Sequence, residues 1–200
     1  DIKGLTMRKS LNVLIFLSGA FFLASGASAT DVLRAEFTQT KTLAGFTKPL
    51  ISSGTVVIYS DLGLIWRQLT PFESSVKILK GKMISRTGDG TPEVVSLPDR
   101  ADSYSIPQLV QAVFSGNDAV LTTHFHVEKE ALSGGKFRYT IVPKTKEGFP
   151  LFLSATVIKA DDVERVDMTD AAKNRTTILF THTRHARLTQ SEANREFQDQ

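Results

Sequence analysis

Short apolar stretches separated by turn residues recur through most of the chain, and this pattern limits it to an antiparallel β-fold. The clearest stretch is Ser53 to Phe72, in which residues 53–59 and 62–69 flank a turn at Ser60-Asp61. Because successive side chains of a strand point to opposite faces of its sheet, one face of this hairpin is predicted to be apolar. The residues predicted on that face are Val56, Ile58, Leu62, Leu64 and Trp66. Such a face can belong to a packed core or to the wall of a cavity for an apolar ligand.

The same pattern continues along the chain. Val76 and Ile78 alternate with Lys77, as expected for a half-buried strand. The strand candidates of the second half are residues 119–130, 136–144, 151–160, 163–170 and 175–188. The turn candidates are Lys80-Gly81-Lys82, Gly88-Asp89-Gly90, Gly134-Gly135, Asp161-Asp162 and Lys173-Asn174. Roughly ten strands with such frequent turns predict a barrel or a strongly curved antiparallel sheet.

Three short helices are predicted beside the strands. Asp31 can cap a first helix over residues 32–41, whose apolar stripe includes Leu33 and Phe37. Residues 106–114 form the second, with Pro107 in its first turn. The third begins at a Ser191 cap and ends near Phe197. The fold class is therefore mainly β with a few helices.

The first 29 residues predict an export signal. Arg8 and Lys9 precede an apolar run of 13 residues, Leu11 to Leu23, and Ala27-Ser28-Ala29 then offers a signal-peptidase site. The run is shorter than the ~20 residues that a membrane-spanning helix needs. We expect residues 1–29 to be upstream residues plus a cleavable signal peptide, and residues 30–200 to form a single domain that is exported to the periplasm or secreted.

Composition excludes some partners and cofactors. The chain has no Cys, so it can form no disulfide and carry no lipid on a terminal cysteine. Its formal charge of +3 falls to about +1 without the four charged residues among the first 29, and the cations are scattered rather than clustered. No nucleic-acid partner is expected.

A search for catalytic and metal-binding patterns yields little. His124 and His126 would share a face of a regular strand, with Thr122 and Glu128 beside them, but an ordinary polar strand face explains this pattern better than a metal site. No G-x-S-x-G, H-E-x-x-H, Walker loop or G-x-G-x-x-G is present. We expect no cofactor and no enzymatic activity; a lipid hydrolase or isomerase is the enzymatic alternative.

Several marks in fixed order resemble a known family. Residues 37–71, FTQTKTLAGFTKPLISSGTVVIYSDLGLIWRQLTP, combine F-x-Q, an S-x-G strand start, G-L-x-W and a following Pro. Later come L-x-x-x-V-F-S-G at 109–116, F-x-V at 125–127, I-x-P at 141–143 and a closing strand at 176–181. This order is similar to the LolA family, the periplasmic carriers of outer-membrane lipoproteins, and in particular to its LolA-like branch.

The resemblance implies an unclosed antiparallel β-barrel that wraps a hydrophobic cavity under a helical lid. It also implies a monomeric carrier or chaperone for lipid acyl chains in the periplasm of a Gram-negative bacterium, served by an inner-membrane loading complex and an outer-membrane acceptor. The aromatic-x-Trp pair that lines the cavity in the carriers corresponds here to Leu64 and Trp66. The residues expected to line the lipid-binding cavity are Phe37, Val56, Ile58, Leu62, Leu64, Trp66, Val76, Ile78 and Phe125.

One departure from the family pattern affects the lid. The carriers have Arg-Pro at the hairpin turn, and the Arg helps to hold the lid shut, whereas this chain has Ser60-Asp61. The alternative to a lipoprotein carrier is therefore an envelope lipid-sensing or regulatory module that uses the same fold.

Overall fold

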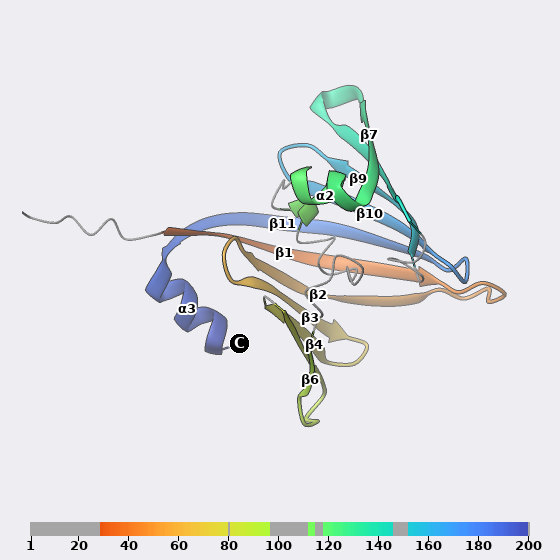
Figure 1. Ribbon diagram of the computed structural model, residues 1–200. Helices are drawn as coiled ribbons and strands as arrows, with labels where there is room; N and C mark the ends of the chain where they lie inside the picture. Colours follow the sequence, from red (N-terminus) through yellow and green to blue (C-terminus); the bar gives the residue numbers. More distant parts are fainter. Residues whose placement is uncertain (1–28, 80, 97–111, 115–117, 146–151, 200) are drawn as a thin grey trace, which may run out of the picture.

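The computed structural model describes residues 29–79, 81–96, 112–114, 118–145 and 152–199. Within these ranges the chain forms one antiparallel sheet of eleven strands. The strands are β1 Ala29–Thr42, β2 Leu50–Tyr59, β3 Gly63–Thr70, β4 Ser74–Leu79, β5 Lys82–Thr87, β6 Glu93–Ser96, β7 Phe125–Ala131, β8 Phe137–Pro143, β9 Phe152–Lys159, β10 Val163–Asp170 and β11 Arg175–Thr189. The sheet is not closed. Its order is β6-β5-β4-β3-β2-β1-β11-β10-β9-β8-β7, and Figure 1 shows the end strands β6 and β7 far apart.

The first predicted helix is wrong, because residues 32–41 belong to the central strand β1. This strand pairs with β2 on one side, with Val32 opposite Tyr59, and with β11 on the other, with Thr42 opposite Arg175. Two long ladders override the weak helical stripe, because Leu33 and Phe37 also fit the two-residue period of a strand.

The described helices are short. Residues 112–114 are helical, which agrees with the end of the predicted helix; the rest of that prediction lies outside the described residues. α2 spans Asp118–His124 and α3 spans Gln190–Asp199, while the 3-10 turn η2, Ser133–Gly135, joins β7 to β8. The strand predicted over residues 119–130 therefore begins only at Phe125. None of the helices in these ranges has the length and hydropathy needed to cross a membrane.

The third predicted helix is confirmed, but its cap differs from the prediction. Thr189, not Ser191, precedes the helix, and its Oγ1 accepts a hydrogen bond from the Glu192 backbone N–H at 3.3 Å. Glu192 Oε2 in turn accepts from the Thr189 N–H at 2.9 Å and from its hydroxyl at 2.7 Å. This reciprocal pair is a capping box, and it fixes where β11 ends and α3 begins.

The sheet has two apolar faces that bury different sets of side chains. The inner face carries Leu33, Ala35 and Phe37 of β1 and continues over all the longer strands. The outer face carries Val32 of β1 and packs against Ala193 and Phe197 of α3; its further members are Val57, Tyr59 and Ile65. Figure 1 shows α2 and α3 on opposite sides of β1 and β11.

A bulge in β11 lets one strand serve both faces. Glu36 of β1 pairs with Thr181 while Arg34 pairs with Arg184, so β11 holds one extra residue here. His182 takes it up with a φ of 52°. Since a one-residue slip moves every later side chain to the other face, Phe180 lies on the inner face and Ala186 on the outer one.

The predicted turns join neighbouring strands as expected. The turn at Ser60-Asp61 connects β2 to β3, and Lys173-Asn174 lies between β10 and β11. Gly88 and Gly134 have φ values of 53° and 72°, which glycine adopts without strain.

Candidate binding site

The inner face brings together eight of the nine residues predicted to line a cavity. Phe37, Val56, Ile58, Leu64, Ile78 and Phe125 are buried there, and Trp66 and Val76 are partly buried against them. The sequence therefore identified a contiguous surface.

Strand register explains why these side chains meet. Leu33, Ile58, Leu64 and Ile78 stand directly opposite one another across β1, β2, β3 and β4. Directly opposed side chains on one face lie about 5 Å apart between Cβ atoms, so these four form a continuous apolar row. A second, parallel row consists of Ala35, Val56, Trp66 and Val76.

Leu62 is the exception, and its placement with the others is wrong. It lies in the turn before β3 and packs against the outer-face cluster. Gly63, which follows with a φ of 139°, resets the strand so that Leu64 points inward. The alternation predicted from residue 62 onward therefore holds only from residue 64.

Aromatic side chains fill the middle of the inner face. The rings of Phe37 and Trp66 lie 4.0 Å apart between centroids at an interplanar angle of 30°. Phe180 of β11 meets Trp66 edge-on at 6.2 Å and Phe114 of the first helical segment at 4.8 Å. Sequence reasoning did not assign Phe114 or Phe180 to the site, although Phe180 alternates with Ile178 in the closing strand and could have been found by its period.

Strands β8, β9 and β10 and the helical segments also contribute side chains to this surface. Ile141 of β8, Val157 of β9 and Met168 of β10 face the same cluster. Ala112, Val113 and Leu121 lie over it from the helical segments. These two short helical segments therefore lie against the inner face and bury part of it.

The inner face offers little polar chemistry. In the described ranges the only buried polar or charged residues are Thr30 and Ser52, and Ser52 Oγ accepts a 3.4 Å hydrogen bond from Gln39 Nε2. Neither carries a charge. A ligand on this face would be recognised by apolar contact rather than by hydrogen bonds or ion pairs.

The two histidines weighed as metal ligands do not share a strand face. His124 is the last residue of α2, whereas His126 lies on β7. Across the part of the chain that the structure describes, no three His, Cys, Asp or Glu residues are placed to hold a metal ion.

The turn at Ser60-Asp61 is tied to the start of β1 and to α3. The Ser60 N–H donates to the Asp31 carbonyl at 2.9 Å, and Ser60 Oγ accepts from the Asp31 N–H at 3.2 Å. The buried Thr30 hydroxyl lies 3.3 Å from Asp61 Oδ2 and 3.0 Å from Gln190 Oε1, and can donate to either. The turn is therefore held against the start of β1, and Thr30 lies between it and the first residue of α3.

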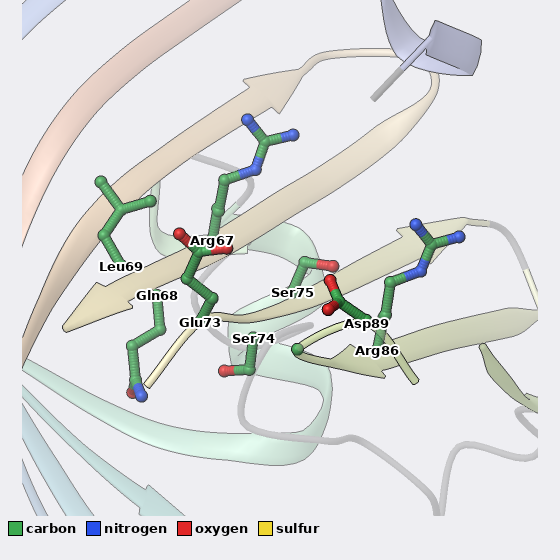
Figure 2. Close-up of a pocket in the computed structure, with 9 residues that line it drawn as sticks. Arg67, Gln68, Leu69, Glu73, Ser74, Ser75, Arg86 and Asp89 are labelled. Atoms are coloured by element: carbon green, nitrogen blue, oxygen red, sulfur yellow. The ribbon is translucent and has the colours of Figure 1, made fainter. Parts of the chain in front are cut away.

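A polar cleft of about 420 Å³ lies away from the inner face. Arg67 of β3, Ser75 of β4 and Arg86 of β5 stand opposite one another, with the strand parity of the outer face. Figure 2 shows both arginine side chains rising on the same side of the sheet, with Glu73 and Asp89 nearby. With charges of both signs, this cleft does not suit an acyl chain.

Comparison with known proteins gives one strong match. A sequence model described as "Outer membrane lipoprotein carrier protein LolA" matches residues 28–194. No curated protein matches the chain significantly.

Three solved structures overlap the fold at low identity. A DUF1329 family protein from Desulfovibrio piger is 11% identical with a TM-score of 0.36, covering 76% of this chain and 85% of its own. A putative outer membrane lipoprotein-sorting protein domain from Vibrio parahaemolyticus is 10% identical with a TM-score of 0.38, covering 85% and 92%. A chain of the MucA/MucB complex from Pseudomonas aeruginosa is 12% identical with a TM-score of 0.31, covering 78% and 52%. These low scores support no transfer of function.

Proposed function

Because this chain belongs to the family of the outer membrane lipoprotein carrier protein LolA, we propose that it is a periplasmic carrier that shields lipid acyl chains, namely those of lipoproteins in transit between the two membranes. The observation that supports this best is the inner face, an apolar surface that continues from β1 to β4 and from β7 to β11 under a helical cover.

The physical need for such a surface is large. Each buried CH₂ of an acyl chain gains about 0.8 kcal/mol, so a lipid with two or three long chains cannot cross water unaided. A carrier must nevertheless release its cargo. The fully buried side chains of the inner face carry no ionisable group. Such side chains hold acyl chains through apolar contact area, and no directional bond to them has to be broken when the chains leave.

In the structure, side chains of the protein itself occupy the inner face. Phe114 packs on Phe180, and Phe180 packs on Trp66. A bound acyl chain would exchange these contacts for its own, and the helical segment that carries Phe114 would move to admit it. The exchange replaces apolar contact with apolar contact, which keeps loading and release close in free energy.

The proposal includes a route. A cleavable signal would deliver residues 30–200 to the periplasm of a Gram-negative bacterium. There the carrier, acting as a chaperone, would receive cargo from an inner-membrane loading complex and pass it to an outer-membrane acceptor.

The single tryptophan of the chain provides the test. Trp66 lies in the proposed wall, so its emission should shift when the full chain is titrated with a synthetic triacylated lipopeptide. Val76→Asn places an amide opposite Trp66 on the inner face and should weaken binding about tenfold, since an unpaired polar group costs about 1–3 kcal/mol.

Leu79→Asn is the matched control. Leu79 is partly buried on the same strand β4 but packs on the outer face, so this variant should bind the lipopeptide as tightly as the parent protein. Absence of binding by the parent, or equal weakening by both variants, would show that the inner face is not the lipid site.

A further inference from the structure

Two hairpins project beyond the rest of the sheet at one end. Figure 1 shows the connection between β1 and β2 and the one between β10 and β11 reaching outward side by side. Three large apolar side chains of the first hairpin are open to solvent: Phe46 is 67% exposed, Leu50 59% and Ile51 60%. We call these residues, with the nearby cations Lys48, Lys173 and Arg175, the tip surface.

The two hairpins are held together by defined hydrogen bonds. The Ala44 N–H donates to Asn174 Oδ1 at 2.9 Å, which links the first hairpin to the second. Asn174 is fixed in turn by Asp170, whose carboxylate accepts from its N–H at 2.9 Å and from its Nδ2 at 2.8 Å. The Phe46 N–H donates to the Leu43 carbonyl at 3.1 Å. Hydrogen bonds therefore fix the turn that carries the exposed apolar side chains of the first hairpin.

The charge around these side chains is positive. Lys48 lies between Phe46 and Leu50, Lys173 is exposed in the second turn, and Arg175 stands opposite Thr42. None of these three cations forms an ion pair with any residue in the described ranges. The carboxylate of Asp170 lies beside the second turn, and hydrogen bonds from Asn174 hold the pKa of this carboxyl below the ordinary value.

Exposed apolar side chains next to cations without an ion pair are suited to the surface of an anionic membrane. The surface of an anionic bilayer attracts each nearby Lys or Arg, and its interface takes up Phe, Leu and Ile side chains. A specific protein partner would need about 800 Å² of complementary surface on each side, whereas the tip surface consists of two convex turns. Charge complementarity and shape therefore both favour a membrane.

We propose that the tip surface docks this protein on the surface of an anionic phospholipid bilayer by inserting Phe46, Leu50 and Ile51 into the interface. This inference does not rest on the proposed function, because the tip surface and the inner face share no side chain. Docking would bring the molecule to a membrane independently of any cargo.

Vesicle co-sedimentation of the full chain tests this proposal. The parent protein should bind vesicles of phosphatidylglycerol and phosphatidylethanolamine, bind phosphatidylcholine vesicles much more weakly, and lose binding when salt rises from about 0.1 M to 1 M, where the screening length falls to about 3 Å. Phe46→Ser combined with Leu50→Ser should lower the partition coefficient at least about tenfold. Val94→Ser, which removes an exposed apolar side chain from β6, should leave it unchanged.

A fluorescence measurement distinguishes insertion of residue 46 into the bilayer from purely electrostatic adsorption on its surface. A Phe46→Trp variant, compared with the parent protein, should show an additional emission component that brominated lipids quench. No binding of the parent to anionic vesicles, equal binding to both vesicle types, or full binding by the double Ser variant would overturn the proposal. Docking on a protein receptor alone, seen as binding only to vesicles that contain membrane proteins, would overturn it as well.

Discussion

The two faces of the sheet should be separable by mutation, and Phe197→Ala tests this most sharply. Phe197 is 4% exposed, and its ring meets that of Tyr59 edge-on at a centroid distance of 5.1 Å. Lys77 Nζ lies 4.6 Å from the centre of the same ring. Losing this side chain removes the main apolar contact between α3 and the outer face.

The expected cost follows from burial. Truncating a buried Phe to Ala destabilises a protein by about 3–5 kcal/mol. For a domain of this size each kcal/mol lowers the melting temperature by about 2–4 °C, so a fall of about 6–20 °C is expected in a thermal scan followed by circular dichroism. Lipopeptide binding measured through Trp66 at low temperature should be unchanged, because Phe197 contacts only the outer face.

Two results would refute this reasoning. A loss of stability below about 1 kcal/mol would mean that α3 adds little to the fold despite its buried contacts. A loss of lipopeptide affinity as large as that of Val76→Asn would mean that the outer face supports the ligand site directly. The inner face could then not be the binding face alone, with the outer face serving only stability.

Three further substitutions have outcomes set by single contacts. Tyr59→Phe removes the 2.9 Å hydrogen bond to Glu196 and should cost about 1 kcal/mol in urea unfolding; an unchanged midpoint would show that the hydroxyl contributes nothing. Hydrogen bonds from Thr189 lower the pKa of Glu192 below its ordinary 4.5, so the stability they confer is present above that pH and is lost as pH falls through the lowered value. Glu192→Gln should therefore lose less stability than the parent between about pH 5 and pH 3, and equal loss would contradict this assignment. Gly63→Ala would place a Cβ 1.9 Å from the Ile78 carbonyl oxygen at a φ of 139°, and soluble, fully stable protein would contradict a predicted cost of about 4 kcal/mol.

The strand periodicity in the sequence was enough to predict most of the sheet and the part of the inner face that β2, β3 and β4 form. Val56, Ile58, Leu64 and Trp66 alternate in two adjacent strands, and a tight turn fixes their register. A period of two over a short hairpin leaves few other ways to bury these side chains. The neighbouring strand β4 is predicted in the same way, because Val76 and Ile78 alternate with Lys77.

Features that depend on long-range pairing could not be predicted from local pattern. β1 carries a weak helical stripe, and only its pairing with β2 and β11 makes it a strand. The bulge at His182 cannot be recognised in the sequence. Thr181 and Arg184 are three residues apart, but they pair with Glu36 and Arg34, which are only two apart, and no local pattern shows this. Without that bulge, a regular strand would have assigned Ala186 to the wrong face.

The outer-face cluster was missed for a related reason. The predicted apolar face of the hairpin holds Val56, Ile58 and Leu64, and no local pattern shows which element would cover Val57, Tyr59 and Ile65 on the other face. The C-terminal helix was predicted, yet its docking on Tyr59 depends on a contact between residues 137 positions apart. A two-faced core is recognised only when the covering helix is placed.

The central claim, that this protein holds acyl chains on its inner face, is tested most directly by native mass spectrometry of the protein purified from the periplasm of its own host. The account predicts a monomer that carries an adduct with the mass of an acylated lipid or lipoprotein, reduced in Val76→Asn and retained in Leu79→Asn. A bare polypeptide mass in all three proteins, from a preparation that also fails to take up added lipopeptide, would contradict it.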